Sequence, residues 1–145
     1  MKTEGVVVAS GRLPSYVYVS TKYGSEILHR IKVTGRIDLE KRLPLYRATL
    51  AINETSNYFC ILDNRDRHEN AFSYADIQEL DQVLIDAGID HFYGATISND
   101  PDYPKLVKLA NDSASTTPME TELMATADPA EAEAFVMGKL RLFLR

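Results

Sequence analysis

The chain has 145 residues, of which 45% are hydrophobic, and its formal net charge at pH 7 is −5. This length favours a single domain over residues 1–145, and the apolar fraction is large enough to bury a core without disulfides or metals. The negative charge and the scattered Lys and Arg residues argue against a nucleic-acid partner, because duplex binding depends on clustered cations. No apolar segment is long enough for a membrane span or a signal peptide, so we expect a cytoplasmic protein.

The first part of the chain predicts an antiparallel hairpin. Residues 16–23 are rich in β-branched and aromatic side chains, and residues 27–33 alternate between the two faces of a half-covered strand. Gly24 and Ser25 mark the turn between them. The short apolar run at residues 6–9 is either a further strand or an arm.

The stretch from residue 58 to residue 88 organises the rest of the prediction. Residues 58–62 form an unbroken apolar run, which is typical of a strand buried on both faces in the middle of a parallel sheet. Ser73 and Asp76 have the spacing of a capping box, in which each side chain bonds to a backbone N–H at the start of a helix. They predict a helix over residues 74–87, ended by Gly88. Strand, loop and helix together form half of a βαβ unit.

The neighbouring helices are less regular in sequence. Asp38 can begin a helix, but proline is costly in a helix interior, so Pro44 moves the expected start of the regular part to about Leu43. A short helix begins at Asp102 or Tyr103, and residues 111–118, which are polar and small, predict a mobile loop after it.

The remaining elements complete an alternating order. Residues 91–97 and 122–126 predict two strands, and Asp128 followed by Pro129 predicts the start of a closing helix. Its basic end, with Lys139, Arg141 and Arg145, suits the negative end of the helix dipole. The order predicts an α/β fold: a mixed sheet of about five strands, made of an N-terminal hairpin and a βαβαβ unit, with four helices packed against it.

This order, together with the sequence Thr-Ala-Asp-Pro-Ala-Glu-Ala at residues 126–132, resembles the STAS-like family, small domains related to sporulation anti-sigma-factor antagonists. The resemblance covers residues 16–145 and implies a STAS-like fold. In the antagonists, a serine at the start of the second helix accepts a phosphate within an Asp-Ser-Ser/Thr-Gly motif. Ser73 occupies the comparable place, but its neighbours are Phe72 and Tyr74, so the Asp and Gly of the motif are missing. Ser73 is therefore either a helix cap, whose loss costs about 1 kcal/mol, or a phosphoacceptor.

Ionisable residues gather after the predicted central strand. Because open α/β sheets bind ligands beyond the carboxyl ends of their strands, a possible ligand or partner surface there has six members: Asp63, Arg65, Asp66, His68, Ser98 and Asp100. Carboxylates of Asp63, Asp100 and Asp128 suit Mg²⁺ by ligand type, but the arginines can equally pair with the acids in an ordinary salt-bridged loop. Because charged loop residues usually pair with one another in this way, we favour the salt-bridged loop and assign no metal site.

Other reactive residue types have ordinary interpretations. Cys60 lies inside the most apolar run and indicates a core residue, and His29 and His91 lie in predicted strands among apolar residues. Tyr16, Tyr18 and Tyr23 of the hairpin suit packing on a sheet, although an exposed pair would indicate a dimer contact. No nucleophile–histidine–acid order and no glycine-rich phosphate loop is present, so we expect no catalytic residue and no cofactor.

These observations leave three hypotheses. The first is a non-enzymatic regulatory or protein-interaction module of the STAS-like type, with a protein partner or a homodimer. The second is a small-ligand-binding protein, or an enzyme that uses the acidic residues Asp63, Asp66 and Asp100. The third is a phospho-switch at Ser73, which mass spectrometry of the protein from its native host would detect.

Overall fold

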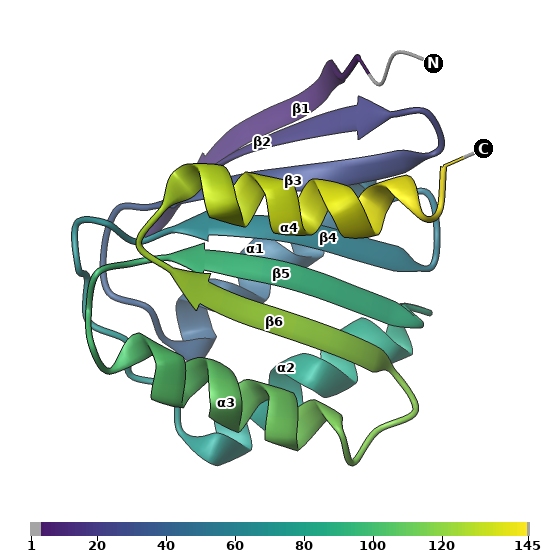
Figure 1. Ribbon diagram of the computed structural model, residues 1–145. Coiled ribbons are helices and arrows are strands. Elements are labelled where there is room, and N and C mark those ends of the chain that lie inside the picture. Colours follow the sequence, from purple (N-terminus) through teal and green to yellow (C-terminus); the bar gives the residue numbers. More distant parts are fainter. Residues whose placement is uncertain (1–3, 145) are drawn as a thin grey trace.

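A six-stranded mixed sheet forms the centre of the computed structural model, which describes residues 4–144 (Figure 1). Arg145, expected at the basic end of the last helix, lies outside the described residues. The strands are β1 (Val6–Leu13), β2 (Tyr16–Tyr23), β3 (Glu26–Val33), β4 (Asn57–Asp63), β5 (His91–Ile97) and β6 (Glu120–Thr126). The helices are α1 (Leu39–Ile52), α2 (Tyr74–Asp86), α3 (Tyr103–Ala114) and α4 (Pro129–Arg141).

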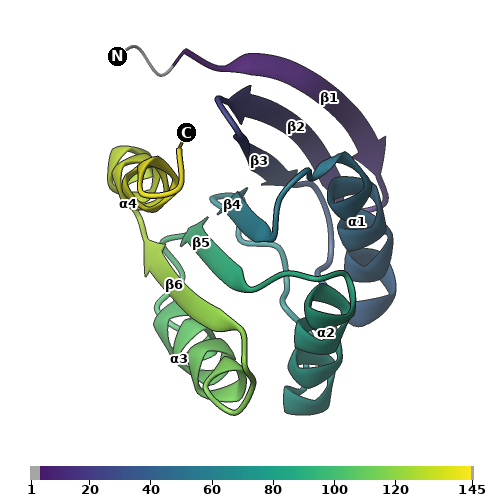
Figure 2. The same ribbon diagram turned by 90° about the vertical axis from the view of Figure 1, so that its right-hand side faces the viewer.

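The strands lie side by side in chain order, from β1 at one edge to β6 at the other. The pairs β1–β2 and β2–β3 are antiparallel, and the pairs from β3 to β6 are parallel. Right-handed crossovers that advance in one direction place their helices on one face of a sheet. Accordingly α1, α2 and α3 lie on one face, and α4, which follows the last strand, packs on β4, β5 and β6 from the other (Figure 2). The α/β class with four helices is confirmed.

The central position expected of residues 58–62 is confirmed. β4 lies between β3 and β5 and pairs in parallel with both. Tyr58 and Phe59 are both fully buried and point to opposite faces: Tyr58 joins the core under α1 and α2, and Phe59 joins the core under α4. An apolar run without alternation is the expected pattern for a strand covered on both faces.

The predicted strand count was one too low, because β1 is a full strand of eight residues. It pairs with β2 from Val6 to Leu13, with a register shift between Val7 and Ala9. Backbone pairing rather than burial holds it in place, since Val6, Val7 and Val8 are 66%, 61% and 45% exposed. The exposed run Val6 to Val8 has no buried face, so its pattern does not distinguish a paired strand from an arm.

Two helix boundaries also differ from the prediction. α1 begins at Leu39, capped by Asp38, which accepts from the N–H of Lys41, and it contains Pro44. Because Pro44 has no N–H, the helix lacks one backbone hydrogen bond in its second turn. We had expected the regular helix to begin only at about Leu43. α3 runs to Ala114, through half of the expected loop at residues 111–118.

The extension of α3 has a tertiary cause. Asn111 exchanges two hydrogen bonds of 3.0 Å with the backbone of Leu123 on β6, and the Ser113 hydroxyl donates to Asp81 on α2 at 2.9 Å. Polar residues of the kinds common in loops thus hold the last turn of this helix against its neighbours.

The hairpin tyrosines form no exposed pair. Tyr16 is fully buried, and Tyr18 and Tyr23 are half-buried. His29 is also fully buried, as expected of a packed histidine. The exposed aromatic pair that would have indicated a dimer contact is therefore missing from this hairpin.

Candidate functional site

The charged residues after β4 pair with one another. Arg65 forms two side-chain bonds to Asp63, of 3.0 and 2.7 Å, and Lys32 lies 3.1 Å from Asp66 and 3.8 Å from Asp63. The bond from Arg65 lowers the pKa of Asp63. These groups neutralise one another, which is the behaviour of a salt-bridged loop.

Ser98 and Asp100 have roles within their own loop. The Ser98 hydroxyl accepts from the N–H of Asp100 at 3.1 Å, and the Asp100 carboxylate accepts from the N–H of Asp102 at 2.9 Å. Asp128 caps α4 in the same way, accepting from the N–H of Ala130. Within residues 4–144, no three His, Cys, Asp or Glu side chains are grouped so that they could hold a metal ion.

Asn64, which sequence reasoning missed, connects the two loops. Its side chain is fully buried, accepts from the N–H of His68 and donates to the carbonyl of His68 and to the hydroxyl of Tyr103, the last at 2.8 Å. Its backbone N–H donates to the carbonyl of Ile97 at the end of β5. His68 is thus held through its backbone, and its ring is not part of this network.

The capping box at Ser73 is present as the sequence indicates. The Ser73 hydroxyl accepts from the N–H of Asp76 at 3.1 Å, and the Asp76 carboxylate accepts from the N–H of Ser73 at 2.9 Å. Ser73 is exposed. Its capping role is a property of the geometry, whereas its phosphorylation stays a prediction.

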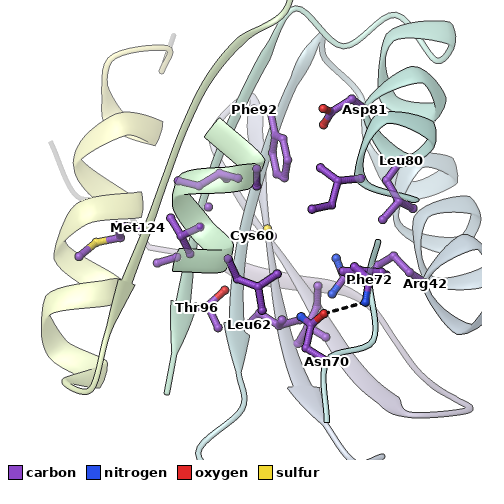
Figure 3. A pocket seen from close by; sticks show the side chains of 18 of the residues that line it. Arg42, Cys60, Leu62, Asn70, Phe72, Leu80, Asp81, Phe92, Thr96 and Met124 are labelled. Atoms are coloured by element: carbon purple, nitrogen blue, oxygen red, sulfur yellow. Dashed lines mark hydrogen bonds between the residues drawn. The ribbon is translucent and has the colours of Figure 1, made fainter. Parts of the chain in front are cut away.

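A largely apolar cavity of about 120 Å³ lies between the sheet and helices α1, α2 and α3 (Figure 3). Its floor lies where two small residues face each other across paired strands, Cys60 on β4 and Gly94 on β5. A Cβ atom at Gly94 would lie 3.0 Å from the Sγ of Cys60 and 3.2 Å from a methyl carbon of Leu123. Cys60 and Leu123 therefore already fill the space beside Gly94, and a larger residue at this position would have to displace them. Leu80 and Phe92 line its walls.

Arg42 of α1 is the one arginine or lysine among the described residues that lines this cavity. Its Nε–H donates to the hydroxyl of Tyr16 at 3.1 Å, and its guanidinium carbon lies 5.3 Å from the ring of Tyr16, 5.7 Å from that of Tyr46 and 5.1 Å from that of Phe72. Burial works to lower the pKa of Arg42, but the phenol oxygens of Tyr16 and Tyr46 raise it, so the guanidinium stays charged. Three aromatic rings from three separate segments hold this cation beside an apolar space.

The cavity also contains a carboxyl group and a thiol. Burial raises the pKa of Asp81, and the hydroxyl of Ser113 that donates to it opposes this shift. Burial likewise raises the pKa of Cys60 to about 12, so at neutral pH this residue is a thiol rather than a nucleophilic thiolate. Figure 3 shows Asp81 and Arg42 apart, with Leu80 between them. The arrangement is chemically suited to binding rather than to nucleophilic chemistry.

Sequence reasoning did not find this site. The expectation that Cys60 lies in the core did not include a cavity beside it. Arg42 lies four residues before Tyr46, on the same helix face, but its other ring partners, Tyr16 and Phe72, are distant in sequence. No local spacing brings these residues together.

One solved structure is similar to this chain over most of its length. It is an uncharacterised protein of the DUF3478 family from Shewanella loihica, described as having a SpoIIAA-like fold. The TM-score is 0.51 at 19% sequence identity, and the match covers 88% of this chain and 98% of that chain. No protein-family model and no curated protein matches this chain. Likeness at this identity concerns the fold, and it confirms the expected architecture: the chain has a SpoIIAA-like, that is STAS-like, fold.

Proposed function

We propose that this protein is a non-enzymatic binding module whose ligand is a small, largely apolar molecule held between the sheet and helices α1 to α3. The observation that carries the proposal is the cavity above Cys60 and Gly94. Its volume of about 120 Å³ is near that of an engineered apolar cavity of about 150 Å³ that binds benzene. Ligand sites are typically apolar clefts with a few polar groups, which is the composition here.

The state of the ionisable groups supports binding without a reaction. Cys60 is a thiol at neutral pH, and two of the acidic residues that an enzyme could use, Asp63 and Asp66, are paired with Lys32 and Arg65. An enzyme that used these carboxylates would need the ion pairs to open. The cavity, in contrast, is suited to a ligand as it stands.

The test uses 1-octanol, a neutral molecule with an alkyl chain, and the methyl NMR signals of the protein. We expect saturable shifts at Leu80 and Leu123, which line the cavity, and a higher thermal midpoint, because a ligand that binds the folded state stabilises it. Ala110→Phe places a ring at the cavity wall and should weaken binding at least tenfold. The matched control is Leu109→Phe on the same helix, where Leu109 is 37% exposed, and it should bind octanol like the parent. Equal binding by both variants, or shifts spread over the surface, would contradict the proposal.

A protein-interaction role is the second candidate, and the exposed edge of the sheet favours it. β1 is a terminal strand, so its outer edge pairs with none of the described strands, and Val6, Val7 and Val8 are exposed along it. An unpaired edge of this kind is a template for a further strand.

Within residues 4–144, no helix is long and apolar enough to cross a membrane.

Self-association through this edge predicts a dimer whose formation depends on Val7. Light scattering after size exclusion, over a hundredfold range of concentration, should show the dimer for the parent and a monomer for Val7→Lys. A parent protein that is monomeric throughout would remove this candidate.

A further inference from the structure

We propose that the ligand of this cavity is an amphipathic monoanion, a carboxylate on a short apolar tail, and that Arg42 binds its carboxylate. This inference rests on the proposed function, because it names the chemical class of the molecule that the cavity holds. The carboxylate would meet the guanidinium, and the tail would lie over Cys60 and Gly94 (Figure 3).

Arg42 has hydrogen-bonding capacity that the protein does not use. A guanidinium carries five N–H donors, and among the described residues the Nε–H of Arg42 donates to the Tyr16 hydroxyl, while the Tyr46 hydroxyl is a further hydrogen-bond partner of its side chain. Two hydroxyl partners leave donors of the group unused. No carboxylate of the described residues lies within ion-pair distance of Arg42, whereas Arg30 and Arg65 each have one carboxylate partner and Arg36 has two. A cation that is partly removed from water without a counterion is costly, so an anion supplied by a ligand gains more here than at the surface.

The guanidinium of Arg42 is preorganised by its aromatic neighbours. Its carbon lies between 5.1 and 5.7 Å from the centres of three aromatic rings, those of Tyr16, Tyr46 and Phe72. The rings come from β2, from α1 and from the loop before α2, so the side chain is held from several sides. Because its direction is already fixed, a ligand pays little to order it, and the planar group can bond both oxygens of a carboxylate.

The charge and the size of the cavity limit the ligand that it can hold. Arg42 supplies one positive charge, and Asp81 is a carboxyl group in the same cavity, so a ligand with several negative charges would meet repulsion. The volume of about 120 Å³ suits a single ring or a short alkyl chain. A monocarboxylate with such a tail satisfies both conditions.

The experiment compares octanoate with 1-octanol by calorimetric titration of the full chain at pH 7.5. These probes share the alkyl chain and differ in the head group. We expect octanoate to bind the parent at least ten times more tightly than octanol. Arg42→Gln should weaken octanoate at least tenfold and change octanol less than threefold, while Arg42→Lys, which keeps the charge but not the planar fork, should fall between.

Arg47→Gln is the matched control, because it removes the same charge from an exposed position of the same helix and should bind both probes like the parent. Circular dichroism of each variant checks folding, and if Arg42→Gln does not fold, the parent's preference and Arg42→Lys still decide the question. Octanol binding as tightly as octanoate, or octanoate binding that is indifferent to Arg42, overturns this inference and leaves the proposed function standing. Failure of both probes to bind the parent overturns both.

Discussion

Phe59→Ala is expected to lower the free energy of unfolding by about 4 kcal/mol, the largest loss we predict for a single side chain of this core. Phe59 is fully buried on β4, and its ring stacks on Tyr93 at 5.8 Å and lies 6.0 Å from Phe143. Removing the ring takes away apolar burial and leaves a cavity between the sheet and α4, which the packed neighbours fill only in part. Urea unfolding measures the loss, and the thermal midpoint should fall by about 10 °C.

Two variants show whether the loss comes from packing in the centre of the sheet. Phe59→Leu keeps most of the apolar volume and should cost about 1.5 kcal/mol. Leu142→Ala removes a side chain that is 76% exposed and should cost less than about 0.5 kcal/mol. If Phe59→Ala cost no more than Leu142→Ala, the position of β4 in the interior would be wrong, and with it the packing of α4.

The parts of the fold that the sequence predicts well are those in which local chemistry and tertiary burial agree. Residues 58–62 are apolar without alternation, and β4 is buried on both faces. Ser73 and Asp76 form the capping box of α2 that their spacing indicates. In both places the pattern follows from contacts within a few residues or from complete burial, and such patterns survive folding unchanged.

The errors occur where tertiary contacts decide the structure. β1 is held by backbone pairing with β2 while its valines stay exposed, so no burial pattern marks its length. The end of α3 is polar because Asn111 bonds to β6 and Ser113 bonds to α2. A polar segment usually indicates a loop, but here the polar side chains lie where α3 contacts β6 and α2.

The candidate site shows the same limit. Asp63, Arg65 and Asp66, which the sequence places close together, form ion pairs with one another and with Lys32. They satisfy one another, however, whereas Arg42 lines the cavity without a carboxylate partner among the described residues, and the sequence shows it beside Lys41 as one of many scattered cations. Its environment is created by Tyr16 and Phe72, which only the fold brings to it.

The second large effect is a loss of stability in acid that depends on His29. The ring is fully buried, and the Ser20 hydroxyl lies 2.7 Å from its Nδ1 while the Asn53 Oδ1 lies 3.1 Å from its Nε2. The Nδ2 of Asn53 already donates to the carbonyls of Thr55 and Asn57, so its Oδ1 faces the ring as an acceptor. We therefore assign the proton of neutral His29 to Nε2, and its Nδ1 accepts from Ser20.

Burial lowers the pKa of His29 from 6.5 to about 4, with the Asn53 hydrogen bond opposing the shift. Between these two values the unfolded chain binds a proton that the folded protein does not, so acid favours unfolding. The contribution of neutral His29 to the free energy of unfolding is complete above pH 6.5, and it is lost as the pH falls towards 4. The total loss is about 3 kcal/mol, of which about 2 kcal/mol falls between pH 7 and pH 5.

Urea unfolding at pH 7 and pH 5 measures this loss of stability in the parent and in His29→Gln. The glutamine side chain does not titrate, so the variant lacks the group that binds the proton. The glutamine variant is expected to be less stable at pH 7 but to lose about 2 kcal/mol less than the parent on acidification. His91→Gln is the matched control, because it removes a histidine that is 30% exposed and leaves His29 in place, so it should keep most of the parent's loss. Carboxylates that begin to titrate near pH 5 are common to all three proteins and cancel in the comparison. An equal loss in the parent and in His29→Gln would show that the buried ring accepts a proton at no cost. Its full burial beside Tyr58, and the absence of a carboxylate partner among residues 4–144, argue against that.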